Sequence, residues 1–85
     1  MPKSVFTDAY ASVIAPLIAL RKEQGVSQVE LARRLGKTQQ FISYVELCER
    51  RIDVVEFFAI VRALGGDPLA VLGKVAARMP AELRI

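Results

Sequence analysis

Apolar residues recur every three to four positions along most of this chain, the spacing that gathers them on one face of a helix. Glycines and capping residues interrupt the pattern and mark where successive helices end and begin. The helices predicted in this way span about residues 7–24, 27–36, 38–46, 53–64 and 67–79. The 85 residues therefore predict an all-α fold of five helices, organised as one domain over residues 1–85.

The first predicted helix contains an internal proline. Thr7 can cap this helix, but Pro16 cannot donate the backbone hydrogen bond that a helix interior needs. We expect one helix kinked at Pro16, rather than a separate turn followed by a helix that begins there. For Met1 to Phe6 the sequence leaves open a disordered arm, a minor-groove reader and a strap on a partner subunit.

The last two predicted helices begin at aspartates that can cap them. Asp53 precedes the fourth helix, and Asp67 stands before Pro68, a pair typical of a helix N-terminus. The residues of the fourth helix expected in the core are Val54, Phe57, Phe58, Val61 and Leu64. The apolar stripe expected on the fifth helix consists of Leu69, Leu72, Val75, Ala76 and Met79.

The two short helices between residues 27 and 46 are separated by only a few residues, as in a helix-turn-helix. Ser27 can cap the first of them, and Glu30 three residues later can complete a capping box. Gly36 suits the left-handed end of that helix, and Thr38 can cap the next one. The segment thus predicts a second helix that crosses the first steeply and presents one face to solvent.

The exposed face of that second helix is polar. Ile42 and Val45 are expected to face the first helix, which leaves the other side pointing outward. A glutamine amide carries a donor and an acceptor that can match N6 and N7 of adenine. We therefore predict base contacts in double-stranded DNA from Gln39, Gln40, Ser43 and Tyr44. For Tyr44 the alternative is a half-buried position against the core.

The spacing of Gln28, Ala32, Gly36, Ile42 and Glu46 resembles the Cro/cI family, the xenobiotic-response-element (XRE) type of transcriptional regulator. Arg21, Gly25, Arg50 and the run 63–65 extend the similarity over roughly residues 10–72. The resemblance implies a five-helix lambda-repressor-like DNA-binding domain that regulates transcription, most simply as a repressor. It also implies a partly buried ion pair between Arg21 and Glu46, which would set the angle of the recognition helix.

Basic residues concentrate around the helix-turn-helix of this chain, whose net charge is +3. Such a surplus fits phosphate binding, although a mixed-charge solvated surface would look similar in sequence. The predicted DNA backbone contacts are Gln28, Lys37, Thr38, Arg50 and Arg51. Phe41 has two equally weighted interpretations, since it either contacts a thymine methyl or a sugar or packs against the first helix of the motif.

A single recognition helix reads few base pairs, so the sequence favours a homodimer on a palindrome with half-sites about 34 Å apart. The predicted dimer surface is the C-terminal helix, about residues 67–79, with Leu69, Val71, Leu72, Val75 and Met79. The alternative function is that of an antitoxin-type protein, which would bind a second protein, a toxin, and repress its own operon. The exposed stripe of the same helix would then hold the toxin.

The chain has no histidine, and neither a metal-ligand cluster nor a phosphate-binding glycine loop stands out, so we expect no enzyme activity, no cofactor and no metal. The absence of a membrane-length apolar segment and the single cysteine favour the cytoplasm. That cysteine, Cys48, stands where the Cro/cI family usually has a left-handed glycine. We therefore expect the connector, residues 47–52 after the second helix of the motif, to turn differently here. Cys48 is either a redox sensor or, more simply, a small buried residue.

Overall fold

The computed structural model describes the backbone of residues 5–83 and the side chains of residues 9–83. Within it the helices are α1 (Val5–Glu23), α2 (Gln28–Leu35), α3 (Gln39–Glu46), α4 (Val54–Ala63) and α5 (Pro68–Arg78), and residues 5–83 contain no strand. The expected all-α architecture of five helices is confirmed. The question left open for residues 1–6 lies outside the side chains that the structure describes.

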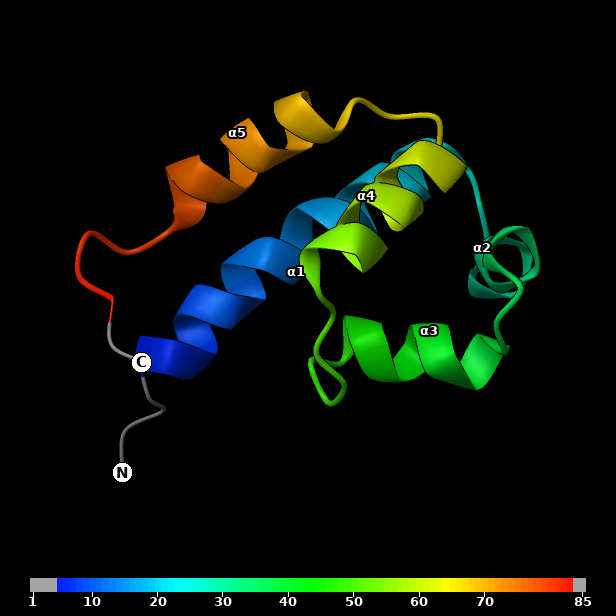
Figure 1. Cartoon of the computed structure of the whole chain (residues 1–85), viewed down its shortest axis with the longest axis horizontal. Coiled ribbons are helices and arrows are strands. Elements are labelled where there is room, and N and C mark those ends of the chain that lie inside the picture. Colours follow the sequence, from blue (N-terminus) through cyan, green and yellow to red (C-terminus); the bar gives the residue numbers. More distant parts are fainter. Residues whose placement is uncertain (1–4, 84–85) are drawn as a thin grey trace.

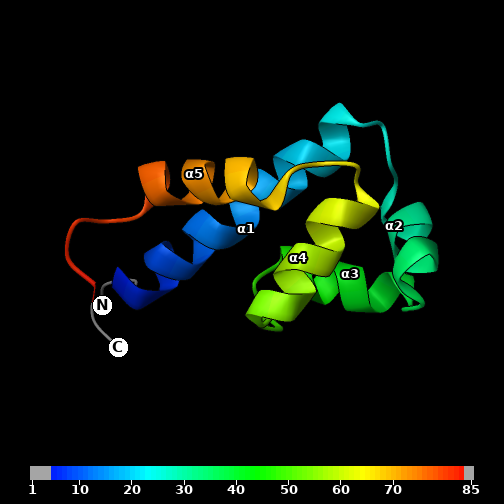
Figure 2. The ribbon, with the colours of Figure 1, turned by 45° about the horizontal axis from the view of Figure 1, so that its top comes forward.

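α1 continues through Pro16, so the interpretation as one helix is correct. The helix begins at Val5, which places Thr7 inside it, and the prediction that Thr7 caps it is wrong. Pro16 deprives the carbonyl of Ser12 of its usual helical donor. The buried hydroxyl of Ser12 donates a hydrogen bond of 3.1 Å to the carbonyl of Arg78, and α1 and α5 lie side by side (Figures 1 and 2).

α2 and α3 lie at one end of the molecule, and the start of α1 and the end of α5 lie at the other (Figures 1 and 2). The core that joins these parts is apolar, and every helix contributes to it. Its buried members are Ile14, Leu17, Val26, Leu31, Ala32, Ile42, Val45, Phe57, Ile60, Val61, Leu64, Val71 and Val75. The first residue of α4, Val54, was expected there but is 73% exposed, because it lies at the end of the helix and not on its buried side, where Phe57, Ile60 and Val61 lie.

α5 buries a different face from the one expected. Val71 and Val75, one turn apart, are covered by the rest of the chain, whereas Leu69 is 75% exposed and Leu72 is 46% exposed. The predicted dimer surface combined these two groups, although they point to different sides of the helix. Val71 and Val75 therefore belong to the core of the protomer, and their assignment to the dimer surface is wrong. Met79 is partly buried against the same core.

Candidate nucleic-acid interface

The start of α2 is capped as expected, but the capping box is absent. The hydroxyl of Ser27 accepts a hydrogen bond of 3.0 Å from the backbone N–H of Glu30. The Glu30 carboxylate does not return to Ser27, because Arg33 binds it at 2.6 Å and Arg34 at 2.9 Å. Hydrogen bonds from Arg33 and then from Arg34 lower the pKa of Glu30 to about 2. The capping box forms at α4 instead, where Asp53 and Glu56 satisfy each other's backbone N–H groups.

The turn between α2 and α3 has the predicted chemistry. Gly36 adopts a φ of 69°, and the N–H of Lys37 donates to the carbonyl of Ala32 at 2.9 Å, so the end of α2 is satisfied. The hydroxyl of Thr38 accepts a hydrogen bond of 3.1 Å from the N–H of Phe41. Residues 36–38 alone separate the two helices, which confirms the helix-turn-helix predicted from the sequence.

The outward face of α3 carries Gln40 and Tyr44, both exposed, while Ser43 is partly covered. The side-chain amide of Gln40 donates to the Tyr44 hydroxyl at 3.1 Å, one turn along the helix. Tyr44 is 43% exposed, so the outward position is the correct one of the two considered. Leu47 lies seven residues after Gln40, shares this face and is mostly exposed. The sequence interpretation missed Leu47, although its helical spacing from Gln40 could have identified it.

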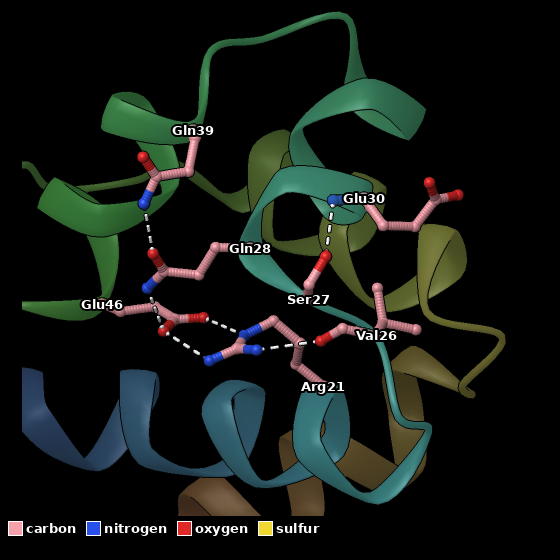
Figure 3. A network of polar contacts seen from close by, with 7 residues as sticks. All are labelled: Arg21, Val26, Ser27, Gln28, Glu30, Gln39 and Glu46. Carbon is pink, nitrogen blue, oxygen red and sulfur yellow. Dashed lines mark hydrogen bonds and ion pairs between the residues drawn. The ribbon is translucent and has the colours of Figure 1, made fainter.

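One flank of α3 is held by a chain of polar side chains that begins on α1 (Figure 3). Arg21 binds the Glu46 carboxylate through Nε at 2.6 Å and Nη2 at 3.0 Å, and its Nη1 donates to the carbonyl of Val26 at 2.9 Å. The amide nitrogen of Gln28 then donates to Glu46 at 2.9 Å, and the amide nitrogen of Gln39 donates to the oxygen of Gln28 at 2.7 Å. We call these four side chains, Arg21, Gln28, Gln39 and Glu46, the polar chain.

The ion pair in the polar chain was predicted, and the two glutamine links were not. Arg21 and Glu46 are only 12% and 13% exposed, which fits the expected partly buried structural pair. Gln28 was assigned to a phosphate, yet its amide also joins the two ends of α3, since Gln39 and Glu46 are seven residues apart on one side of that helix. The spacing of 39 and 46 was visible in the sequence, but the reach of Gln28 depends on how α2 crosses α3.

The opposite flank of α3 is held by Phe41 and two cations. The Phe41 ring is partly buried against the core, with Lys37 Nζ at 5.1 Å from the ring centroid and Arg50 Cζ at 4.8 Å. Of its two interpretations, packing is therefore the correct one. Phe41 stands one turn before the buried Val45 and so lies close to the same side of α3. Both cations lie over the ring, where its π-electrons attract them.

The residues predicted to contact the DNA backbone also have partners within the protein. Arg50 donates to the Glu56 carboxylate at 2.9 Å, and this hydrogen bond, followed by one from the backbone of Asp53, lowers the pKa of Glu56. Gln28 belongs to the polar chain. Arg51 lies over the Tyr10 ring, its Cζ 4.4 Å from the centroid. Burial raises the pKa of Tyr10, whose hydroxyl accepts a hydrogen bond of 3.0 Å from the N–H of Ile52.

The connector after α3 keeps a left-handed residue although the chain has no glycine there. Cys48 adopts a φ of 61°, and the N–H of Glu49 donates to the carbonyl of Tyr44 at 2.9 Å. The expectation that the connector turns differently is wrong, because the helix end still needs these hydrogen bonds. A Cβ in this left-handed conformation strains the backbone of Cys48. The Cys48 side chain also packs against the core, and this contact offsets part of the strain.

A second surface lies away from α3, between the connector and α5. An apolar groove of about 340 Å³ runs along α1, α4 and α5 there. Its exposed apolar members include Val54 and Leu72, and Phe58 forms part of its wall. Val55 and Leu69, both more than 70% exposed, extend the apolar character of α4 and α5 beyond the groove. We call this surface, with Val54, Val55, Phe58, Leu69 and Leu72, the apolar surface.

None of the helices in residues 5–83 combines the length and apolar character that a bilayer span requires. In the same part of the chain, no three metal-binding side chains converge.

Comparisons with known proteins agree on one kind of domain. A family model described as helix-turn-helix matches residues 17–71. An XRE-family like protein from Pseudomonas syringae pv. tomato is 43% identical, with a TM-score of 0.77 over 85% of this chain and 88% of that chain. A crystal structure of the clp gene regulator ClgR from Corynebacterium glutamicum, 24% identical, has a TM-score of 0.73 over 93% of this chain and 97% of its own, and supports the fold alone. No curated protein sequence matches the chain.

Proposed function

Since the chain belongs to the XRE (Cro/cI) family of helix-turn-helix proteins, which bind DNA and regulate transcription, we propose that it is a repressor that binds a palindromic operator as a homodimer. The observation that carries this proposal is the start of α3, where two neutral bidentate side chains, Gln39 and Gln40, stand exposed. Gln39 donates to Gln28 and Gln40 donates to Tyr44, but each amide retains a donor and its oxygen for base reading in the major groove.

We assign base contacts to Gln39, Gln40, Ser43 and Tyr44, with Leu47 added for contact with a thymine methyl. Backbone contacts are assigned to Gln28, Lys37, Thr38, Arg50 and Arg51. Lys37 carries the greatest weight among them, because it stands in the turn directly before α3 and its contact with the Phe41 ring leaves its charge unneutralised. Arg50 carries less weight as a backbone contact, because the nearby Glu56 carboxylate already offsets its charge.

For the homodimer we propose the apolar surface, with Leu69 and Leu72 of α5 at its centre. Leu69 and Leu72 are the two members of the predicted dimer interface that the protomer leaves exposed, and Val54 and Val55 of α4 add to them. Exposed apolar side chains that border an apolar groove are typical of a protein-binding site. The connector that borders the groove follows α3 directly, so a two-fold pairing here would set the separation of the two recognition helices.

Selection of bound sequences from a random DNA duplex pool at physiological salt tests the DNA-binding claim. We expect a palindromic consensus with half-sites about one helical turn apart. The double variant Gln39→Ala, Gln40→Ala should fold, keep its affinity for random DNA and lose the consensus. Lys37→Ala should weaken binding to all sequences and lower the salt slope by about one unit, whereas Lys74→Ala on α5 serves as the matched control without effect. Equal losses on specific and random DNA in the double variant would contradict base reading.

Repression and dimerisation have separate tests. A reporter gene whose promoter contains the selected operator should be expressed less when the protein is present, and higher expression would identify an activator instead. Sedimentation at micromolar concentration should show a two-chain species that Leu72→Glu splits and that Leu83→Glu, an equally apolar exposed site outside the apolar surface, leaves intact. A monomeric parent protein would refute the dimer and favour the antitoxin-type alternative, in which the apolar surface binds a toxin.

A further inference from the structure

The polar chain has a direction, because its members cannot exchange donors and acceptors freely. The Glu46 carboxylate is held by two donors of Arg21 and offers only acceptor atoms. The amide of Gln28 must therefore turn its nitrogen toward Glu46, and its oxygen is left facing Gln39. Gln39 in turn must donate its nitrogen to that oxygen. The charge at Glu46 thus fixes the orientation of both amides (Figure 3).

From this direction we propose that Glu46, which lies on the protein side of α3, determines which base Gln39 reads. The inference rests on the proposed base-reading role of Gln39. With one N–H committed to Gln28, Gln39 retains one N–H and its oxygen for DNA. This donor and acceptor match N7 and N6 of adenine. With the amides reversed, the oxygen of Gln39 would point toward Gln28 and both N–H donors would face the groove, where they match N7 and O6 of guanine.

Two features of the structure make this coupling effective. Gln39 and Glu46 lie two turns apart on α3, about 10 Å along the helix axis, so Glu46 itself does not reach the base that Gln39 reads. Gln28 spans that separation with both of its amide atoms occupied, at 2.9 Å and 2.7 Å. The pair of Arg21 and Glu46 is shielded from solvent, so water does not replace Glu46 as the partner of Gln28. Glu46 acts through Gln28 as a positioning residue.

The experiment compares base preference in three variants of the whole chain. Gln39→Ala first identifies the position of the selected consensus that Gln39 reads, as the position whose preference disappears. Affinities are then measured by fluorescence anisotropy on two duplexes that carry adenine or guanine at that position. Glu46→Gln keeps the shape of the side chain but can present an N–H to Gln28. Arg21→Lys weakens the same ion pair while it keeps the carboxylate, and it controls for lost stability.

We expect the parent protein and Arg21→Lys to prefer adenine over guanine with ratios that agree within about twofold, and Glu46→Gln to reduce that ratio about tenfold. If Glu46→Gln does not fold, the double variant Arg21→Gln, Glu46→Gln removes the unpaired charge and should show the same reduction. An unchanged ratio in a folded Glu46→Gln protein would overturn the inference and leave base reading by Gln39 intact. A consensus that Gln39→Ala does not alter, or a base other than adenine at its position, would overturn the inference together with the assignment of Gln39.

Discussion

One flank of α3 is held by an ion pair that the protein nearly encloses, whereas the other flank carries an ion pair of the same chemistry at the surface. Arg21 and Glu46 are 12% and 13% exposed, and Arg50 and Glu56 are 44% and 27% exposed. The enclosed pair contacts α1, α2 and α3 at once, while the surface pair joins the connector to the first turn of α4.

The difference shows that burial, more than the number of charged contacts, decides how much each ion pair contributes to stability. Water screens the surface pair, so its contribution is about 0–1 kcal/mol. The enclosed pair has lost its water, and either partner left alone would be a charge without compensation. The enclosed pair therefore contributes more than the surface pair to holding α3 in place.

Removal of one enclosed charge should have the largest effect and is the strongest test of the difference between the two ion pairs. Glu46→Ala should lower the free energy of unfolding by about 3 kcal/mol, because Arg21 would lose its partner in a covered position. Urea denaturation followed by circular dichroism measures the change, and 0.5 M sodium chloride should leave it nearly unaltered. A loss no larger than that in Arg50→Ala would show that the two flanks are equivalent.

Cys48, two residues after Glu46, is a position where a substitution should raise stability instead. Cys48→Gly should stabilise the protein by about 1 kcal/mol, since glycine adopts the left-handed backbone without strain. The lost contact of the Cys48 side chain with the core reduces this gain. Thermal unfolding of Cys48→Gly and Cys48→Ala separates the two effects, because alanine keeps the strain and loses the sulfur. If Cys48→Gly melts no higher than Cys48→Ala, backbone strain at this position contributes nothing.

A smaller effect is expected on the surface flank. Arg50→Ala removes the contact with Glu56 and the cation over the Phe41 ring, and should destabilise the protein by about 0.5–1 kcal/mol. Added salt should reduce that loss, which distinguishes it from the loss in Glu46→Ala. A salt-independent loss above 2 kcal/mol would place Arg50 among the structural residues of the fold.

The smallest effect belongs to Glu30, at the surface of α2. Its pKa of about 2 lies below that of an unfolded glutamate, about 4.3, so the carboxylate stabilises the fold above the higher value. This contribution is lost as the pH falls through the lower value. A carboxyl carbon NMR titration should show the Glu30 signal changing near pH 2, and an Arg33→Ala, Arg34→Ala variant should return it toward 4. An ordinary midpoint in the parent protein would show that these arginines do not bind Glu30 in solution.

Local signals explain why much of the site could be predicted from the sequence. Caps at Ser27, Thr38 and Asp53 and the left-handed Gly36 depend on a few neighbouring residues, and the structure has each of them. The ion pair of Arg21 and Glu46 was implied by family resemblance and is present.

For α5 and Phe41 the outcome depends on the placement of other parts of the fold. The buried side of α5 is set by α1 and α4, so the stripe pattern alone did not separate Val71 from Leu72. Phe41 was ambiguous until its packing against the core was known. The capping box at Glu30 failed because Arg33 and Arg34 compete for the same carboxylate, and a helical pattern alone does not rank such competitors.

The hydrogen bond between Ser12 and Arg78 has a consequence for biosynthesis. These residues are 66 positions apart, so the side of α1 that α5 covers stays open while the intervening chain is being translated. The helix-turn-helix leaves the ribosome well before α5 does, and its core partners on α1 are already present at that time. The helix-turn-helix can therefore pack against α1 before the final helix covers it, and premature termination of translation before Pro68 would release a chain whose α1 is uncovered on that side.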